Sequence, residues 1–513
     1  MQSITAYLDR SNCLREPDVF RIHPSTCISG EEPLRRLIWI CLGPALGLSI
    51  VVFAWWLFVE PTPSVAAQPV QNVLPQALSA TANPKIVPTA TLSYTVARGE
   101  TIPGIARHYL SRTSYLTSTE LAEAIRQTNG KSSNSVRSGE TLNIPGMLDQ
   151  PMVEKSIAVP RDFEVRAVYL TGAMAGSEHG LRIIRRWREL GGNAVVFDVK
   201  DSDGILNIAF THPMATDKRH PVIPDLAKFA HFLHSQGIHA IARIAVFRDE
   251  HLVVTHPELA VDSRRTGQPW RENGKLVWTD PSNPQVQEYN IALARRAAES
   301  GVDEIQFDYV RFPAEGDQKD ASFVFQREHP SWKRTDVITD FLKHAYSTLS
   351  GEGVLLSLDV FGVMAWQRQV DLSHTGQDIP NMAKYSDVLS PMIYPSHFFG
   401  MEGYRHPGDA PEHFIGESMD RFVLITKDTG VVLRPWLQAF RWRTKTYSSN
   451  YIQVQVKASK EKGGDGFQFW NANNNYRQPY DAMPSMRAAK LFRGDELPGH
   501  GNVASVTPRP AAE

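Results

Sequence analysis

The stretch that decides the fold is GVDEIQFDYVRFP, which runs from Gly301 to Pro313. Its residues alternate between two faces with the period of two that is typical of a strand: Ile305, Phe307 and Tyr309 against Gln306, Asp308 and Val310. The first face is apolar enough to lie under helices. The second suits the polar mouth of a barrel better than a closed sheet core. The stretch therefore predicts a buried strand that carries the Asp308 carboxylate to its C-terminal end.

The same signature recurs along the chain. AVVFDVKD (194–201) places Asp198 and Lys200 opposite an apolar face, and LLSLDVFG (355–362) does the same with Ser357 and Asp359. Eight segments in all are candidate strands: 165–172, 194–201, 238–247, 304–313, 355–362, 388–396, 433–440 and 466–472. The segments between them have apolar residues at helical spacing. This alternation predicts an α/β fold, a (β/α)8 TIM barrel over residues 160–493, with its catalytic groups at the strand C-termini.

Composition limits the classes of function. The chain has 513 residues, more than one barrel needs, and a formal net charge of -1, so it lacks the basic footprint of a nucleic-acid-binding protein. Among eleven tryptophans, four lie near predicted strand ends and loops, where they could stack on sugar rings: Trp270, Trp278, Trp366 and Trp470. Core packing is the alternative for each of them.

The N-terminus predicts a membrane anchor. Residues 37–59 carry no charge and are long enough to span a bilayer, and Arg35 and Arg36 precede them. The prediction is a single-pass protein of the bacterial inner membrane, with residues 1–36 in the cytoplasm and the rest outside. A signal peptide cleaved near Ala66 is the alternative. The exported part has no cysteine, which fits an oxidising compartment. Residues 60–90 are expected to be a flexible linker, and residues 494–513 a disordered tail.

Residues 91–147 contain two halves with the same strand and turn pattern. YTVARGETIPGIARHYL, ELAEAIRQTNG and VRSGETLNIPG follow one another, and Gly-Glu-Thr occurs in both halves, at residues 99–101 and 139–141. Together these motifs resemble a LysM domain over residues 93–146. The resemblance implies binding of glycans that contain N-acetylglucosamine, such as peptidoglycan or chitin. The residues alone predict a small βααβ module, and a degenerate LysM domain used as a spacer is the alternative.

The predicted barrel also resembles a known family. From about Val165 to Asn475 the chain carries FDVKD, RIAVFRD, HPELAV, WTDPSNPQVQEYN, DEIQFDYVRFP, SLDVFG and SPMIYPSHF. These blocks resemble the glycoside hydrolase family DUF4015 and, more distantly, other glycosidase-like TIM barrels. The resemblance implies an extracytoplasmic enzyme that acts on a polysaccharide.

Glycoside hydrolysis needs two carboxyl groups that flank one bond, and the strand ends supply candidates. Asp308 and Asp359 end the fourth and fifth strands, which are neighbours in a barrel, so they are the predicted catalytic pair. Asp198, beside Lys200, could hold a sugar hydroxyl or shift a neighbour's pKa. A structural ion pair with Arg243 or Arg311 is the alternative for each acid. Gln438 ends strand seven, which disfavours glycosidases that pair glutamates on strands four and seven.

The remaining predictions concern substrate and alternatives. We expect substrate contacts from seven residues at the strand ends: Asp198, Lys200, Arg243, Arg311, Tyr394, Gln438 and Trp470. We predict no metal and no cofactor, because no metal-binding or nucleotide-binding motif is found. The sequence thus predicts a membrane-anchored glycoside hydrolase. A glycan-binding scaffold without turnover is the alternative, and a lyase or deacetylase with Tyr394 as base is a third.

Overall fold

The computed structural model describes residues 90–216 and 219–498. The predicted cytoplasmic segment, the anchor at 37–59 and nearly all of the predicted linker lie outside the described residues. Over the described ranges, no helix combines the length and the apolar character that crossing a bilayer requires.

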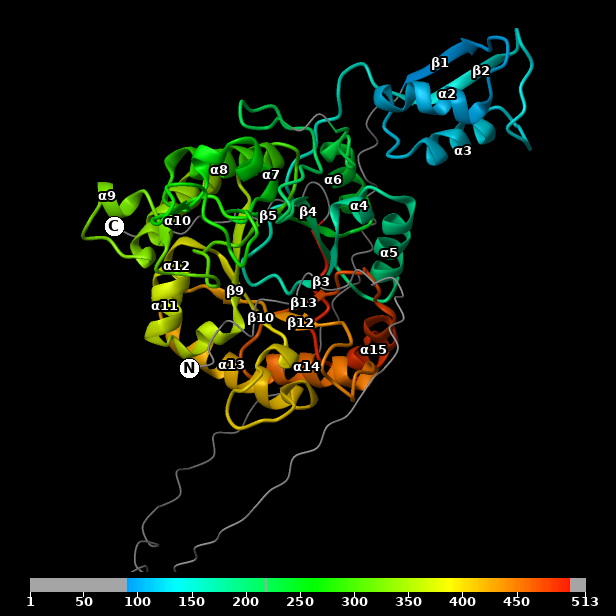
Figure 1. The fold of residues 1–513 in the computed structure, drawn as a ribbon. Coiled ribbons are helices and arrows are strands. Elements are labelled where there is room, and N and C mark those ends of the chain that lie inside the picture. The colour runs from blue at the N-terminus through cyan, green and yellow to red at the C-terminus, as the bar shows by residue number, and fades with distance from the viewer. Residues whose placement is uncertain (1–89, 217–218, 499–513) are drawn as a thin grey trace, which may run out of the picture. The chain divides into compact units, whose positions relative to one another are not determined.

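Eight parallel strands close into a barrel, as the alternating segments predict. Their order is β3-β4-β5-β7-β9-β10-β12-β13, and β13 pairs with β3 to complete the circle. Figure 1 shows the strands around a common centre with helices outside them. The strands are β3 (Arg166–Leu170), β4 (Ala194–Lys200), β5 (His239–Ala245), β7 (Glu304–Asp308), β9 (Leu355–Phe361), β10 (Val388–Ile393), β12 (Trp436–Gln438) and β13 (Phe467–Trp470).

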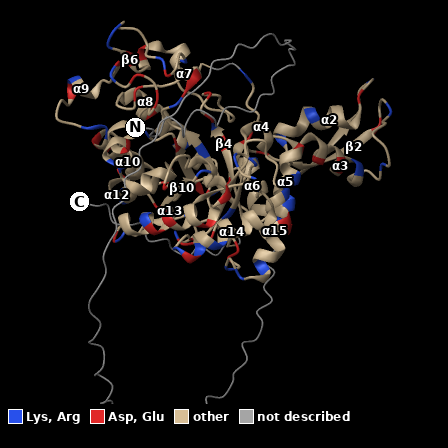
Figure 2. Ribbon diagram, turned by 60° about the horizontal axis from the view of Figure 1, so that its bottom comes forward, with Lys and Arg blue, Asp and Glu red and all other residues tan. Residues whose placement is uncertain are grey.

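Helices connect the strands and cover the outside of the barrel. In chain order the longer ones are α5 (Glu178–Glu189), α6 (Leu226–Ser235), α8 (Pro284–Ala298), α10 (Arg334–Ser350), α13 (Pro411–Ile425), α14 (Ser449–Glu461) and α15 (Arg477–Ala488). Between β9 and β10 the connection contains the short α-helices α11 (Gln369–Thr375) and α12 (Ile379–Met382), together with two 3-10 helices, Gly362–Trp366 and Ala383–Tyr385. Basic and acidic residues both occur along these outer helices (Figure 2).

Strand β7 shows how the two faces of each strand are used. Ile305 and Phe307 are fully buried in the apolar layer between strands and helices. The opposite face is polar from bottom to top of the barrel interior. Glu304 forms an ion pair with Arg434 at 2.8 Å, and the Gln306 side-chain amide donates to Ser390 Oγ at 3.2 Å. Asp308 is the last residue on this polar face and lies at the C-terminal mouth of the barrel.

Three strand details differ from the sequence prediction. Strand β7 ends at Asp308, because Tyr309 has a φ of 53° and turns the chain out of the extended conformation. The predicted strand 433–440 is divided at Pro435 into β11 (Val432–Leu433) and β12, since proline has no N–H for a ladder bond. The pairing of β4 with β5 shifts register between Asp198 and Lys200, so these two residues do not share one face.

The N-terminal module is a βααβ unit, as its sequence predicts. Strands β1 (Ala90–Thr95) and β2 (Thr141–Met147) pair antiparallel, and helices α2 (Ile102–Tyr109) and α3 (Ser118–Thr128) lie between them in the chain. Thr117 and Glu120 form a capping box at the start of α3. The assignment to LysM domains stays a prediction.

The first residues of the predicted disordered tail are ordered and contact the barrel domain. Asp495 accepts a hydrogen bond from the backbone N–H of Glu164 at 3.1 Å, and its carbonyl accepts one from Arg166 at 2.9 Å. These bonds hold the start of the tail beside β3. Residues 499–513 lie outside the described residues.

Candidate active site

Arg243, near the end of β5, connects the acids at the barrel mouth. Its Nη1 donates to Asp198 Oδ1 at 2.5 Å and to Asp201 Oδ1 at 3.2 Å. Its Nε and Nη2 donate to Asp308 Oδ2 at 3.2 and 2.7 Å. The backbone N–H of Tyr309 donates to the other Asp308 oxygen at 2.6 Å. The predicted acids therefore converge, and the ion pair with Arg243 that the sequence offered as an alternative is present.

Asp359 lies beside this cluster but is held differently. Its Oδ1 accepts a hydrogen bond from the indole N–H of Trp436 at 2.7 Å, and its Oδ2 lies 3.9 Å from Arg243 Nε. Because the same Nε lies 3.2 Å from Asp308 Oδ2, the two Oδ2 atoms are at most about 7 Å apart. This bound includes the separation of about 5 Å in retaining glycosidases and the lower end of the inverting range.

The charges at the mouth do not balance. Four carboxyl groups surround one guanidinium, and Arg243 is the single cation that forms ion pairs with them in residues 90–216 and 219–498. Burial raises the pKa of Asp359 well above its usual range, and the nearby Asp308 raises it further, against the effects of Arg243 and Trp436. The surroundings of Asp359 therefore favour its protonated form.

Asp198 is held by two donors. Tyr169 donates its hydroxyl proton to one carboxyl oxygen, and Arg243 binds the other. Burial raises the pKa of Asp198 to about 7, although Arg243 and the Tyr169 hydroxyl oppose the shift. With both oxygens engaged and 1% of its surface exposed, Asp198 orients Arg243. The Asp308 side chain is more open, 9% exposed against 1% for that of Asp359.

Aromatic rings form one wall of this cluster. Trp470 stacks on Tyr169 with ring centroids 4.0 Å apart and meets Trp436 edge-on at 5.5 Å. The Arg243 guanidinium lies 5.3 Å from the Trp470 ring. Trp470 is half-buried, whereas Trp270 and Trp278 are buried in the core. Among these three, Trp470 alone lies at the cluster with part of its surface open.

Lys200 and Arg311 are not bonded to the acid cluster. The register shift in β4 sends Lys200 to Asp249, where its Nζ donates at 2.7 Å and both side chains are buried. The Arg311 guanidinium lies between the rings of Trp278 and Phe361, at 4.6 and 4.5 Å. These placements correct the expectation that Lys200 stands beside Asp198 on the inner face.

Gln438 and Tyr394 shape the loops at the mouth. The side-chain oxygen Oε1 of Gln438 accepts a hydrogen bond from the Ser396 N–H at 3.2 Å. Its side-chain nitrogen Nε2 donates to the backbone carbonyls of Phe440 and Trp442. Gln438 is fully buried, so it holds loops instead of facing solvent. Tyr394 packs on Phe440 with centroids 5.6 Å apart.

Sequence reasoning missed three members of the cluster. Asp201 follows strand AVVFDVK directly, in a tight turn closed by the Gly204 N–H, which donates to the Asp201 carbonyl at 2.9 Å. Asp-Ser-Asp-Gly is typical of such turns, so the sequence gives no sign that Asp201 also contacts Arg243. Tyr169 and Trp436 read as ordinary core aromatics, because a strand pattern does not show which aromatic ring carries a hydrogen bond to an acid.

A comparison with protein families now defines the class. Residues 167–476 match the model of the DUF4015 family, described as a putative glycosyl hydrolase domain. The match covers more than half of the chain and contains the whole acid cluster. The chain belongs to this family. No curated protein matches it.

Several solved structures are similar. A hypothetical protein from Ruminiclostridium thermocellum shares 35% identity, over 38% of this chain and 97% of that one, with a TM-score of 0.33. The glycoside hydrolase domain of PgaB (BpsB) from Bordetella bronchiseptica shares 16% identity, over 63% and 98%, with a TM-score of 0.47. An α-galactosidase from Thermus thermophilus shares 15%, over 70% and 69%, with a TM-score of 0.42. At TM-scores this low, none of these similarities carries an argument.

Proposed function

We propose that the protein is a glycoside hydrolase that cleaves O-glycosidic bonds of a cell-envelope or extracellular polysaccharide. The observation that carries the proposal is the unequal carboxyl pair at the C-terminal mouth. Asp308 accepts three hydrogen bonds, two of them from Arg243, and Asp359 is a buried acid whose pKa is raised well above its usual range. A base or nucleophile beside a proton donor is what glycoside hydrolysis requires.

The roles follow from the surroundings of each acid. Asp359 donates its proton to the departing glycosidic oxygen, because burial raises its pKa and so favours the protonated form. Asp308, the more open of the two, attacks the anomeric carbon or activates water. Arg243 holds the Asp308 carboxylate in place, and Trp470 offers a partly open ring on which a sugar can stack.

The test is the release of new reducing ends from a panel of envelope and extracellular polysaccharides by the purified protein. The matched control is Asp308→Asn, which keeps the shape of the side chain and removes its charge. We expect the variant to lose about 100-fold or more in turnover, the scale of acid–base catalysis. Its melting temperature should change little.

Two other outcomes have separate meanings. A lower melting temperature with nearly intact activity would show that Asp308 serves only its ion pair with Arg243. Retention of a glycan without new reducing ends would favour the alternative, a glycan-binding scaffold.

We also propose that the protein is anchored in the bacterial inner membrane and that its N-terminal module binds peptidoglycan or a chitin-like glycan. Support comes from the uncharged run at 37–59 after Arg35 and Arg36, and from the repeated Gly-Glu-Thr motifs. Release by alkaline extraction would contradict the anchor. Failure of residues 91–147, when folded, to be retained on both polymers would contradict the binding role.

A further inference from the structure

A second candidate site lies in the loops that follow β10 and β12. These loops enclose a cavity of about 720 Å³, within the range of small-molecule sites, about 300–1,000 Å³. Both strands end at the barrel mouth, and β10 is paired with β9, which carries Asp359. The cavity therefore opens on the same end of the barrel as the proposed catalytic pair.

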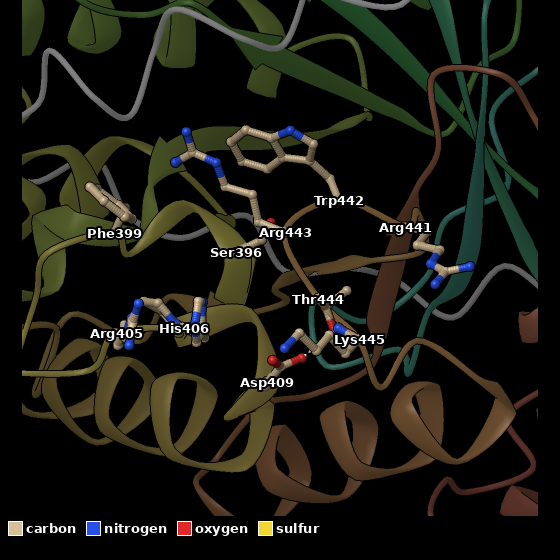
Figure 3. A pocket seen from close by; sticks show the side chains of 11 residues that line it. Ser396, Phe399, Arg405, His406, Asp409, Arg441, Trp442, Arg443, Thr444 and Lys445 are labelled. Carbon is tan, nitrogen blue, oxygen red and sulfur yellow. Dashed lines mark hydrogen bonds between the residues drawn. The ribbon is translucent and has the colours of Figure 1, made fainter. Parts of the chain in front are cut away.

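Basic side chains dominate the cavity lining. It contains Arg405, Arg441, Arg443 and Lys445, with His406, against the single carboxylate of Asp409. The side chains of these arginines and of the lysine are exposed and form no ion pair with any residue that the structure describes. In Figure 3, Arg405, His406, Asp409 and Lys445 lie along one side of the cavity, and Phe399, Arg443 and Trp442 along the other. This concentration of positive charge contrasts with the near-zero net charge of the chain.

The one carboxylate in the cavity is already used by the loops. Asp409 Oδ1 accepts hydrogen bonds from the Thr444 hydroxyl at 2.9 Å and from the Lys445 N–H at 2.7 Å. The two loops also touch through their backbones, since a Cβ at Gly408 would lie 2.3 Å from the Arg443 carbonyl oxygen. The cavity is thus held in shape before any ligand binds, which lowers the entropic cost of binding.

Arg443 is positioned by its backbone conformation and by two neighbouring rings. Its φ of 46° is unusual for a residue other than glycine. Its guanidinium lies 4.6 Å from the ring of Trp442 and 5.0 Å from the ring of Phe399. A planar cation held between rings keeps its N–H donors available for a ligand, and such a fork matches carboxylate or phosphate oxygens.

Aromatic rings connect the cavity with the acid pair. His397 lies 4.8 Å from Trp442 and 5.2 Å from Tyr394, measured between ring centroids. Tyr394 packs in the same cluster as Trp436, whose indole N–H binds Asp359. These rings, of which Tyr394 is buried, form a packed bridge between the cavity wall and the residue that holds Asp359.

We propose that this cavity binds an anionic sugar unit, so that the substrate is an acidic polysaccharide. The proposal rests on the proposed glycosidase function and names its substrate class. The anionic group is a carboxylate or a phosphate on the sugar, and the guanidinium groups of Arg405 and Arg443 bind it by charge-assisted hydrogen bonds.

The test measures binding by calorimetry with the full chain carrying Asp308→Asn, so that no probe is cleaved. Two matched pairs of short probes are used. Oligogalacturonate is compared with its neutral methyl ester, and phosphomannan oligosaccharide with plain mannan oligosaccharide. We expect at least one acidic probe to bind about 10-fold more tightly than its neutral partner, and the pair that does so distinguishes carboxylate from phosphate.

Variants then locate the effect. Arg405→Gln and Arg443→Gln should each weaken binding of the acidic probe by about 10-fold and leave the neutral partner unchanged. Lys457→Gln, at an exposed lysine of α14, is the control and should change neither. Equal affinities within both pairs, or equal losses for acidic and neutral probes, would overturn the proposal. Acidic binding without turnover by the wild-type protein would refute the glycosidase function alone.

Discussion

Arg243 determines how charge is shared at the barrel mouth. A single guanidinium contacts three carboxylates directly and lies within 3.9 Å of a fourth. Ionising all four would leave an excess of negative charge in a buried site, which costs free energy. Protonation of Asp359, which burial favours, relieves this excess. The ion pair between Arg243 and Asp308 therefore does not exclude catalysis. The same cluster places a proposed acid, Asp359, next to a proposed base or nucleophile, Asp308.

The role of Asp359 as proton donor is tested with Asp359→Asn. We expect about 100-fold or more loss of turnover on a natural glycan, because its leaving alkoxide needs a proton. Activity on a glycoside with a nitrophenolate leaving group should be largely retained. In the wild type, turnover of the natural glycan should fall as alkaline pH removes the Asp359 proton, since burial raises its pKa.

Asp201→Asn is the matched control for this experiment. Asp201 also contacts Arg243, but its side chain is 40% exposed and holds no place in the proposed reaction. If Asp201→Asn, and not Asp359→Asn, showed the dependence on the leaving group, the acid role would belong to Asp201.

At the scale of elements, strand β12 organises the loops of the mouth through one side chain. Gln438 binds the start of the loop after β10 and two carbonyls of the loop after β12. Gln455 of α14 in turn binds both backbone groups of Gln438. Gln438 occupies a strand end where some glycosidases have a catalytic glutamate. In this protein it shapes the basic cavity instead.

Replacement of Gln438 by alanine should loosen both loops. Each buried partner left without a hydrogen bond costs about 1–3 kcal/mol, so we expect a lower melting temperature. Binding of acidic oligosaccharides should weaken, while kcat on a short nitrophenyl glycoside stays near wild type because the acid pair is untouched. Equal losses on both substrates would contradict a role confined to the loops.

At the scale of the whole molecule, a buried ion cluster ties the segment before the barrel to its outer layer. His234 of α6 lies between Glu154 and Asp303, at 3.2 and 3.1 Å. Asp303 also accepts hydrogen bonds from the backbone N–H groups of Ile157 and Ala240. Burial lowers the pKa of His234, but these two carboxylates outweigh it and raise the pKa to about 9. His234 thus joins helix α6 to the segment that precedes the barrel.

This pKa predicts how stability depends on pH. The folded-state pKa of His234 lies above its unfolded value of 6.5, so its contribution is complete below pH 6.5 and is lost as pH rises to about 9. With about 1.4 kcal/mol for each pKa unit, the free energy of unfolding should fall by about 3 kcal/mol across this window. Denaturant titrations at the two pH values measure it. In His234→Gln the decline should be much smaller, and an equal decline would contradict the assignment.

The barrel could be predicted from the sequence because its signal is local. Each strand buries one face under helices. The alternation of apolar and polar residues in segments such as 304–308 and 355–361 therefore shows directly which residues face the helices and which face the barrel interior. The position of Asp308 and Asp359 at strand ends follows from the same alternation, and neighbouring parallel strands bring such ends together.

Tertiary structure alone decided the partners at the mouth. Arg243 meets Asp308 across 65 residues of sequence, and Trp436 meets Asp359 across 77, distances over which a local pattern carries no information. A register shift redirected Lys200, and the positive φ of Tyr309 ended β7 at Asp308, five residues before the predicted end at Pro313. The basic cavity arises from two loops that are 35 residues apart at Asp409 and Thr444. The sequence by itself determined which residues reach the mouth, whereas packing between distant segments decided which of them meet, because contact depends on closure of the barrel.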